Sequence, residues 1–348
     1  MNFLIIRRDN IGDLVCSTPL IRALREHYPD AWIGALVNSY NAPVLDGNTD
    51  LNAVFSYTKA KHRATGVSKW AVYRDRARML WTLRRKHIDY AIIAGANHLP
   101  RALRLARFVA PEHVIGFTPS DGRADAQIDC GIQYDNPKGM HEVEDVFRLL
   151  TQLGIVGEPP PMRVVADYAH VAQARAQMRP EQNLVPALIG LHISARKPDN
   201  RWATDDFIEI GRRLRSRFGC RLVLFWSPGS EDNVHHPGDD GKAAAISDAL
   251  SEAGVVPYPT DELGELITGL ACCDALLCSD GGAMHIAAAL QVPMVCMFGP
   301  TDASRWHPWR CKHRLLQPVS RRVADVSVDE VEAAFASLLD VTTALDVD

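Results

Sequence analysis

Residues 3–20 read FLIIRRDNIGDLVCSTPL, and this stretch decides the fold class. The apolar run FLII (3–6) predicts a buried first strand, and LIRALREHY (20–28) predicts the helix that follows it. A strand that leads directly into a helix opens a parallel α/β unit, whose ligands bind beyond the carboxyl ends of the strands. The turn at Gly12 and Asp13 is therefore the first candidate functional site.

This turn differs from a dinucleotide-binding turn. The pattern G-x-G-x-x-G brings bare backbone amides to a pyrophosphate, whereas here a single glycine, Gly12, precedes the carboxylate of Asp13. We therefore expect no dinucleotide at this position. An acid in the first turn of a helix is also favoured by the helix dipole, so a purely structural Asp13 is the alternative. Pro19 predicts either a kink or the true first turn of the helix.

The rest of the chain alternates apolar and amphipathic segments, which predicts an α/β fold with doubly wound parallel sheets. GEPPPM (157–162) is a stiff, proline-rich stretch suited to a domain boundary, and a second α/β series begins at ALIGLHIS (187–194). We expect a ligand cleft between two domains. The predicted domains are residues 1–160, residues 161–325, and a C-terminal helix and tail over 326–348. The other predicted strands cover 31–37, 52–57, 88–95, 113–117, 221–226 and 254–259, and the other predicted helices cover 70–87, 101–107, 141–154, 204–218, 261–273 and 327–340.

Composition indicates a soluble globular protein, with 348 residues of which 47% are apolar and 23% charged. No apolar run approaches the roughly 18 to 20 residues of a membrane span, and the N-terminus lacks the pattern of a signal peptide. The eight cysteines form no CxxC pair. We therefore expect reduced thiols in a cytoplasmic protein, and neither disulfides nor zinc.

Charge is unevenly distributed along the chain. Residues 1–110 hold 17 Lys and Arg against 8 Asp and Glu, whereas the remainder holds 21 against 34. The basic residues concentrate in RDRARMLWTLRRKH (74–87) and RALRLAR (101–107). This asymmetry predicts that the first half faces an anionic partner, and two solvated helix faces are the alternative.

The stretch CSDGGAMHIAAAL (278–290) ends an apolar strand and begins an Ala-rich helix. Free amides at a Gly281–Gly282 tight turn, at the positive end of the helix dipole, predict an anion site. Asp280 would repel a phosphate, so we expect it to accept hydrogen bonds from sugar hydroxyls, and His285 to donate to a phosphate or sugar oxygen. The alternative is a purely structural role for each residue, with Asp280 as a helix N-cap, the two glycines as a turn and His285 as a core residue.

Two further loops follow strands of the second half. HISARKPDNRW (192–202) carries Arg196, Lys197 and Arg201, which predict a clamp for a pyrophosphate, and WSPGSEDN (226–233) offers Glu231 to a ribose. Either loop alone is also compatible with simple solvation. Their shared position at one sheet edge predicts a nucleotide pocket there.

Several familiar chemistries lack their sequence patterns. The chain has no G-x-x-x-x-G-K-[ST], no G-x-S-x-G and no H-E-x-x-H. His235 and His236 with Asp239 and Asp240 do not have the spacing of metal ligands, so we expect no metal site.

Two stretches together resemble glycosyltransferase family 9, the bacterial heptosyltransferases: IGDLVCSTPLIRALREHYP near the start and SDGGAMHIAAALQVPMVCMFGPTD near the end. The RW after the cationic loop and the segment GMHEVED agree with this resemblance, which extends over nearly the whole chain. It implies a GT-B fold of two Rossmann-like domains facing across a cleft. The acceptor would bind the N-terminal domain, and a nucleotide-sugar donor, usually ADP-heptose, the C-terminal one. The resemblance further implies inversion at the anomeric centre without a metal or other cofactor.

Carried over by position, the resemblance makes Asp13, in the GD motif, the general base. One departure concerns Asn200, where many members have a Lys, and we expect Arg196 or Lys197 to supply the missing charge. The resemblance also makes Asp280 the acceptor of the sugar hydroxyls and places Gly281, Gly282 and His285 on the phosphate side.

Together with the loop and charge patterns, the predicted donor-binding residues are Ser194, Arg196, Lys197, Asn200, Glu231, Asp280, Gly281, Gly282 and His285, and the predicted acceptor-binding residues are Arg101, Arg104, Arg107 and His141.

The sequence thus predicts a cytoplasmic, inverting glycosyltransferase that acts on an anionic lipopolysaccharide-core or related surface-glycan acceptor. We expect peripheral contact with the inner membrane surface and no nucleic-acid partner. The alternatives are a transferase that uses another nucleotide sugar, such as an N-acetylhexosamine donor, a sugar-nucleotide epimerase, and a catalytically silent nucleotide-sugar-binding protein. The basic first half argues against the epimerase, which recruits no anionic acceptor, and Asp13 argues against the silent protein.

Overall fold

A computed structural model describes residues 1–58, 68–123, 125–135, 137–179, 187–232 and 237–339. The chain divides into two compact units, Met1–Val164 and Val165–Asp348. The division falls a few residues after the predicted boundary at 160, just beyond the proline-rich stretch. Within the stretch 326–348, predicted as a C-terminal helix and tail, the structure has the helix Val328–Leu339, which packs on the second unit.

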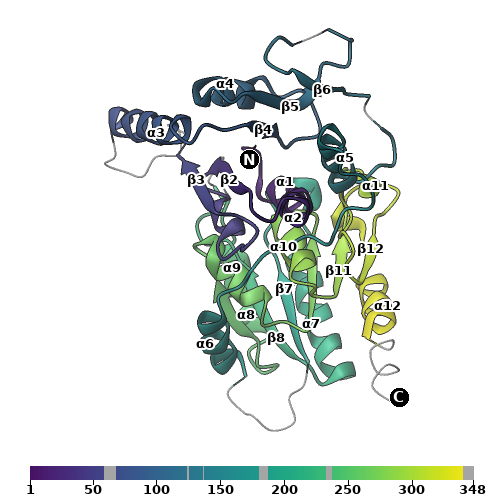
Figure 1. Ribbon diagram of the computed structural model, residues 1–348. Helices are drawn as coiled ribbons and strands as arrows, with labels where there is room; N and C mark the ends of the chain where they lie inside the picture. The colour runs from purple at the N-terminus through teal and green to yellow at the C-terminus, as the bar shows by residue number, and fades with distance from the viewer. Residues whose placement is uncertain (59–67, 124, 136, 180–186, 233–236, 340–348) are drawn as a thin grey trace, which may run out of the picture. The chain divides into compact units, whose positions relative to one another are not determined.

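The N-terminal unit alternates strands and helices. Its elements are β1 (Asn2–Ile6), α1 (Ile11–Val15), α2 (Thr18–His27), β2 (Trp32–Asn38), η1 (Ala42–Leu45), β3 (Ala53–Tyr57), α3 (Lys69–Arg84), β4 (Tyr90–Ile93), α4 (Pro100–Val109), β5 (His113–Thr118), β6 (Cys130–Gln133), α5 (Glu142–Phe147) and η3 (Arg148–Leu153). The strands form one parallel sheet in the order β3-β2-β1-β4-β5-β6 (Figure 1). In its register, Ile5 of β1 pairs with Ala35 of β2 and with Ile92 of β4. The order reverses between β1 and β4, so the carboxyl ends of these strands form the topological switch point of the unit.

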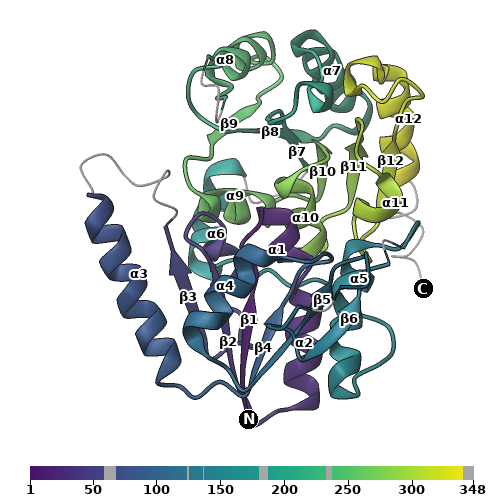
Figure 2. The same ribbon diagram turned by 90° about the horizontal axis from the view of Figure 1, so that it is seen from above.

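Helices cover both faces of this sheet (Figures 1 and 2). On one face, Leu4 and Ile6 pack with Leu103 of α4 and other side chains of α3 and α4. On the other face, Phe3 meets Tyr28 at the end of α2, with the ring centroids 5.1 Å apart. Successive strand residues point to opposite faces, so coverage of both faces explains why β1 is a continuous apolar run.

The C-terminal unit repeats the topology of the first. Its elements are α6 (Tyr168–Met178), β7 (Leu188–His192), η4 (Pro198–Asn200), α7 (Thr204–Phe218), β8 (Arg221–Trp226), α8 (Asp240–Ala249), β9 (Val256–Pro259), α9 (Leu263–Leu270), β10 (Ala275–Ser279), α10 (Gly282–Ala289), β11 (Met294–Met297), α11 (Ala303–Trp306), β12 (His313–Leu316), η5 (Val323–Asp325) and α12 (Val328–Leu339). The parallel sheet has the order β12-β11-β10-β7-β8-β9, and its switch point lies between β7 and β10.

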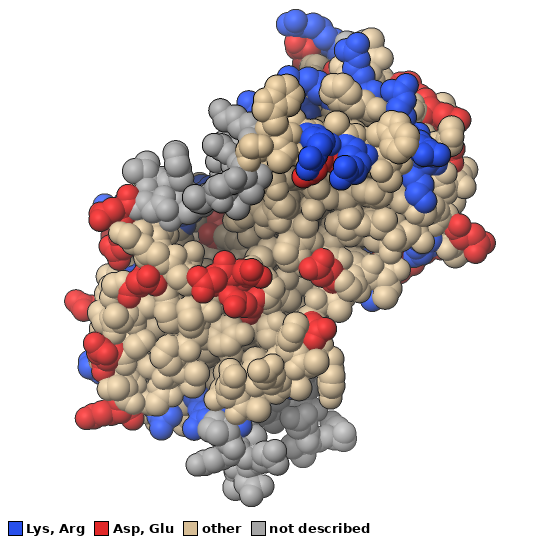
Figure 3. Space-filling view, turned by 90° about the vertical axis from the view of Figure 1, so that its left-hand side faces the viewer, with Lys and Arg blue, Asp and Glu red and all other residues tan. Residues whose placement is uncertain are grey.

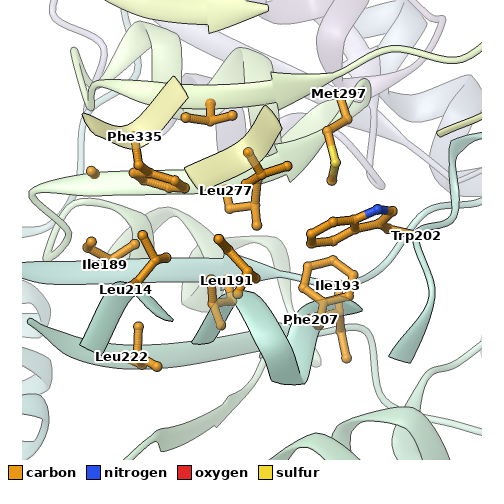
Figure 4. Packing of buried hydrophobic residues seen from close by; sticks show 14 of the residues in the cluster. Ile189, Leu191, Ile193, Trp202, Phe207, Leu214, Leu222, Leu277, Met297 and Phe335 are labelled. Carbon is orange, nitrogen blue, oxygen red and sulfur yellow. The ribbon is translucent and has the colours of Figure 1, made fainter. Parts of the chain in front are cut away.

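One face of the second sheet packs against α7, α8 and α12 (Figure 4). Ile189 and Leu191 of β7 point into this core. Trp202 is buried in it, edge-on to Phe207 with the ring centroids 5.0 Å apart, and its Nε1 donates to the carbonyl of Val326 at 2.8 Å. This tryptophan therefore anchors the loop that carries the predicted cationic clamp.

Two predicted helices differ in detail from the structure. Helix α2 begins at Thr18 with Pro19 in its first turn, so Pro19 marks the true helix start and causes no kink. The helix predicted over 141–154 is α-helical only to Phe147 and continues as the 3-10 turn η3. It ends at Gly154, whose φ of 74° is the left-handed conformation that favours glycine.

Several elements have no clear signal in the sequence, among them β6, α6, α8 and β12. The two strands lie at sheet edges, are only four residues long and contain no buried residue, so their apolar pattern is weak. The two helices bury only a few side chains each, which hides the 3.6-residue period.

The eight cysteines are all free thiols, and seven of them are buried. Burial raises the pKa of thiols such as Cys220, to about 11, and thus suppresses their reactivity. No helix of the described residues is long and apolar enough to cross a membrane.

One group of metal-type ligands occurs among the described residues, formed by His113, Asp129 and Cys130. These residues lie at the amino ends of β5 and β6, the edge of the sheet opposite the switch point. His235 and His236, for which we expect no metal role, lie outside the described residues.

Candidate functional site

Arg7 lies at the switch point of the N-terminal unit. It directly follows β1, is 2% exposed, and donates from Nη1 to the carbonyl of Ala94 just beyond β4. Its Nη2 donates to Oδ1 of Asp13 at 2.8 Å and to Oε1 of Glu142 at 2.9 Å. Its Nε lies 3.3 Å from Oδ2 of Asp9. One buried guanidinium thus bridges the two strands and gathers three carboxylates.

Asp13 is the third residue of α1, and both of its carboxylate oxygens are bound. Oδ1 accepts from Arg7, and Oδ2 accepts from the backbone N and from Nδ2 of Asn10 at 2.9 and 3.0 Å. Asn10 and Asp13 form a capping box at the start of α1, so Asp13 has the structural role held open as the alternative. Its side chain is still 16% exposed. These contacts orient the carboxylate without covering it.

The cluster around Arg7 keeps Asp13 ionised. Burial by itself raises the pKa of Asp13, but the charge of Arg7 and the hydrogen bonds from Asn10 outweigh burial, so this pKa is below its ordinary value. Burial likewise opposes the charge of Arg7, and Asp13, Glu142 and Asp9 outweigh it and raise the pKa of Arg7. With three acids to one base, the cluster favours a hydroxyl over a phosphate as its neighbour.

Two buried asparagines hold the loop between β1 and α1. Nδ2 of Asn38 donates to the carbonyl of Asp9 at 3.2 Å, and Nδ2 of Asn41 donates to the carbonyls of Asp9 and Asn10 at 3.3 and 3.4 Å. Oδ1 of Asn41 accepts from the backbone N of Asn38 at 3.1 Å. The loop that carries Asp13 is therefore preorganised.

His141 is the N-cap of α5. Its Nδ1 accepts from the backbone N of Val143 at 3.1 Å, and its own backbone N donates to Oε2 of Glu144 at 2.9 Å. The residue is 1% exposed. The cap begins the helix whose first residue, Glu142, reaches Arg7. A contact between His141 and an acceptor stays a prediction.

Arg101, Arg104 and Arg107 are exposed on α4, while Ala102 and Leu103 between them pack in the core. Figure 3 faces the side on which α3 lies, and it shows Lys and Arg gathered over the N-terminal unit. The predicted basic surface is thus present, and its role toward an acceptor stays a prediction.

Asp280 directly follows β10, at the switch point of the C-terminal unit. Asn200, which is buried, donates from Nδ2 to the carbonyl of Asp280 at 3.1 Å and to its Oδ2 at 3.3 Å. Gly299 makes room for this amide, because a Cβ there would lie 2.3 Å from Oδ1 of Asn200. Asn200 therefore positions Asp280 and brings no positive charge to it.

Helix α10 begins at Gly282, and Gly281 before it has φ 164° and ψ −173°. This backbone is extended, so the predicted tight glycine turn is wrong. A Cβ at Gly281 would meet only the carbonyl oxygen of Ser279, at 4.0 Å, so no described neighbour requires glycine there. Close approach of a ligand to the backbone would explain a glycine at position 281. His285, one turn further, is buried with its ring against Trp306 at a centroid distance of 5.9 Å.

Ser194 and Arg201, both partly exposed, form a network with the buried carboxylate of Asp239. Oγ of Ser194 donates to Oδ2 of Asp239 at 2.6 Å, and Nη1 of Arg201 donates to Oδ1 of Asp239 at 3.0 Å. Nε of Arg201 also donates to the carbonyl of Ala195 at 2.8 Å. Arg201, one of the three predicted clamp cations, therefore holds its own loop.

The other two clamp cations, Arg196 and Lys197, are exposed. Within the described part of the chain their side chains make no hydrogen bond or ion pair. Glu231 is exposed on the loop after β8, and Asp240 in the same region accepts from Nε1 of Trp226 at 2.8 Å. Arg196 and Lys197 are therefore the cations of this loop that can meet an anionic ligand.

Lys242 and His192 are two further basic residues at or close to the loop 192–202. Nζ of Lys242 donates to the carbonyl of Trp202 at 2.7 Å, and burial lowers the pKa of Lys242 to about 8 although Asp239 opposes this shift. Burial and then the charge of Lys242 lower the pKa of His192 to about 4, so His192 is neutral.

Three buried polar atoms of segment 192–201 have no partner among the described residues: Nδ1 of His192, Oδ1 of Asn200 and Nη2 of Arg201. The large majority of buried side-chain polar atoms in proteins have a hydrogen-bond partner. Their concentration in one loop at the switch point indicates that a polar ligand or bound water completes this edge.

No sequence pattern singled out Arg7 and Glu142, which orient Asp13, or Lys242, which supports the loop before α7. A charged residue directly after a buried strand was the available signal for Arg7. Glu142 and Lys242 lie far from their partners in the chain, so only the fold brings them into place.

The chain has clear relatives among known proteins. The sequence model of glycosyltransferase family 9 (heptosyltransferase) matches residues 76–328, which leaves the turn at Asp13 outside the match. Lipopolysaccharide heptosyltransferase 3 of Escherichia coli is 26% identical over 86% of this chain and 83% of its own length. Lipopolysaccharide heptosyltransferase 2 of Salmonella typhimurium is 23% identical over 98% of this chain and 95% of its own.

Solved structures show the same fold. A glycosyl transferase family 9 protein from Veillonella parvula superposes with a TM-score of 0.80 at 17% identity, over 98% of this chain and 97% of that one. The ADP-heptose lps heptosyltransferase II of E. coli gives 0.78 at 19% identity, over 99% and 100%. Two Rossmann-like units with these neighbours are the GT-B fold. Because the family model covers most of the sequence, this chain belongs to glycosyltransferase family 9.

Proposed function

We propose that this glycosyltransferase moves a heptosyl group from ADP-heptose to an anionic lipopolysaccharide-core or related surface-glycan acceptor, with inversion at the anomeric carbon. Relatives named lipopolysaccharide heptosyltransferases, which align over nearly their whole length, support the choice of sugar and acceptor. Membership of a glycosyltransferase family argues against a sugar-nucleotide epimerase.

Asp13 is the proposed general base. As the acceptor oxygen attacks the anomeric carbon, its proton passes to the Asp13 carboxylate. The new C–O bond forms while the bond to the diphosphate breaks, and the diphosphate leaves with the electron pair. The low pKa of Asp13 makes it ionised but weakly basic. The proton therefore moves late, when bond formation has already made the hydroxyl acidic.

The observation that carries this proposal is the cluster of three carboxylates around Arg7. Arg7 holds Asp13 in one orientation and in its charged form, and the surplus of negative charge disfavours a phosphate beside it. A carboxylate that takes a proton from a neutral hydroxyl must be oriented and ionised, as Asp13 is. A phosphate site needs positive charge instead.

On the donor side, the proposal assigns the departing diphosphate to Arg196, Lys197 and the free amides at the start of α10. Asp280, positioned by Asn200, would accept hydrogen bonds from the sugar hydroxyls. These protein groups, and no metal or other cofactor, supply the compensating charge in the proposal. The enzyme would work in the cytoplasm, where its free thiols stay reduced.

The proposal is tested by calorimetric titration with ADP-heptose, ADP and UDP-N-acetylglucosamine, followed by determination of the anomer formed on a lipopolysaccharide-core acceptor. We expect ADP-heptose to bind at least about tenfold more tightly than UDP-N-acetylglucosamine, a difference of roughly 1.4 kcal/mol, and the product to be inverted. Preference for UDP-N-acetylglucosamine would replace the donor by an N-acetylhexosamine. A retained anomer would contradict the role of Asp13.

A further inference from the structure

Helix α3 has apolar side chains on two sides. One side, with the buried Leu83 at its centre, packs in the core of the N-terminal unit. The other side carries Trp70, Tyr73 and Trp81, which are 84%, 51% and 58% exposed. Their spacing of i, i+3 and i+11 puts them on a single face of the helix. A surface helix ordinarily presents polar residues opposite its core, so this aromatic stripe requires another explanation.

Arginines flank the stripe. Arg74, Arg78 and Arg85 are exposed beside it, and the guanidinium of Arg85 lies 4.7 Å from the centroid of the Trp81 ring. Asp75 is the one acid in the sequence of α3, and it is paired with Arg74 at 3.4 Å. We call this surface the α3 aromatic face: Trp70, Tyr73 and Trp81 with Arg74, Arg78 and Arg85. Figure 3 shows the basic character of this side of the unit.

The neighbouring helix α4, which contacts α3, repeats the combination. Phe108 is 62% exposed, and it lies on the exposed side of α4 beside Arg104 and Arg107. Two adjacent helices thus present large aromatic rings among arginines. Exposed apolar groups rimmed by charge usually mark an interaction surface.

We propose that the α3 aromatic face docks on the surface of a bilayer that contains anionic lipid headgroups. Trp and Tyr rings prefer the boundary between headgroups and acyl chains, where one part of the ring is apolar and another is wet. Arginines beside them keep their stems on the apolar side and their charges at the phosphates. A helix lying in the interface plane combines an apolar face with cations beside it, as the aromatic rings of α3 and the arginines along one edge of them do.

A nucleic acid fits this face less well. Single strands bind in a basic groove with the aromatic rings spaced for stacking between bases, whereas here the rings stand on the outward side of one helix. The membrane contact is also independent of catalysis, since it needs neither donor nor acceptor. Its failure would therefore leave the proposed heptosyl transfer intact, and the two proposals can be told apart.

The test is co-sedimentation of the full chain with vesicles of phosphatidylcholine, alone or mixed in equal parts with phosphatidylglycerol. We expect binding to the mixed vesicles, weakening with added salt, and at least about tenfold weaker binding of a Trp70→Ser/Trp81→Ser double variant, since each ring would bury a large apolar area on docking. Tyr168→Ser, which removes an exposed aromatic side chain from the other unit, is the matched control and should bind like the parent.

Three further measurements separate docking from a loss of structure. The double variant should keep the thermal midpoint of the parent, because both rings are exposed. A Trp70→Phe/Trp81→Phe variant should recover most of the binding, and brominated lipids should quench the tryptophan fluorescence of the parent more than that of the serine variant. Equal vesicle binding of parent and serine variant, or tighter binding of the parent to a single-stranded oligonucleotide than to the mixed vesicles, would overturn the proposal.

Discussion

Three carboxylates depend on one buried cation at Arg7. Removing one partner of a buried ion pair leaves the others unpaired in a poorly solvating environment, which costs roughly 3–5 kcal/mol of folding free energy. Because the pKa of Asp13 is lower in the folded chain than in the unfolded one, its pairing stabilises the fold at neutral pH. That contribution is lost as the pH falls from the ordinary carboxyl pKa of about 3.9 through the folded value.

Arg7→Met should therefore raise the pKa of Asp13. If Asp13 must be ionised to accept a proton, the acidic limb of the pH–rate profile should move to higher pH by about one unit or more. The midpoint of urea unfolding should fall at the same time. Arg7→Lys, which keeps the charge, should show a smaller shift of the limb. An unmoved limb in Arg7→Met would mean that the limb reports another group.

Asp280 should discriminate between the sugar and the nucleotide of the donor. Asp280→Ala should weaken ADP-heptose binding by roughly tenfold or more, the value of one hydrogen bond to a charged group, and leave ADP affinity nearly unchanged. Titration calorimetry with both ligands measures the difference. Glu252→Ala removes an equal charge from an exposed position before β9 and is the control. An equal loss for ADP and ADP-heptose would rule out the contact with the sugar.

At the scale of elements, each functional side chain comes from the point where a parallel strand ends and a helix begins. β1 and α1 present Asp13, and β10 and α10 present Asp280 and the free helix amides. Both points are switch points of their sheets, where the helices on either side of the reversal diverge and leave the strand ends open. The acidic site thus belongs to one unit and the cationic loop to the other.

Gly281→Ala, which adds one methyl group, tests whether a phosphate binds at the amides that begin α10. The extended backbone of Gly281 admits alanine, and the nearest described atom to its Cβ is 4.0 Å away, so Gly281→Ala should change folding stability by no more than about 1 kcal/mol. If a phosphate approaches these amides, the same variant should weaken ADP binding by tenfold or more, since even a small displacement disrupts several short hydrogen bonds. Unchanged ADP affinity would place the phosphate elsewhere.

The basic surface of α4 should act on the acceptor. Attraction between exposed charges is screened over about 8 Å at physiological salt, so the acceptor KM should rise with ionic strength while the donor KM changes less. Replacing Arg101, Arg104 and Arg107 with Gln should reproduce much of that rise at low salt. A double Gln variant at Arg212 and Arg215, exposed on α7 in the other unit, is the control. Acceptor kinetics insensitive to both salt and the triple change would make α4 an ordinary solvated helix.

At the scale of the whole molecule, the architecture follows from local patterns. The buried runs at β1, β7 and β10 and the helices between them are readable because both faces of each central strand are covered. The edge strands β6 and β12 and the helices α6 and α8 bury few side chains and were not predictable in this way. The turn at Gly281 was predicted wrongly, because a Gly-Gly pair shows that the backbone is free and not which conformation it adopts.

The candidate site divides along similar lines. Asp13, Asp280 and Ser194 were predictable, since each follows directly on or soon after a strand end. The partners that orient them come from distant parts of the chain, as Glu142 does for Arg7 and Asp239 for Ser194. Such pairings depend on tertiary packing, for which one sequence carries no local signal.

The proposed chemistry depends most directly on Asp13, and one substitution isolates it. Asp13→Asn keeps the size and the acceptor oxygen of the side chain but removes its basicity, so the rate of heptosyl transfer should fall by roughly 10²- to 10⁴-fold. Donor affinity, measured by titration of the same variant with ADP-heptose, should stay within about twofold of the parent, since a 0.4 kcal/mol difference corresponds to that factor. Transfer in single turnover at near the parent rate, with the fold intact, would contradict the assignment of Asp13 as the general base.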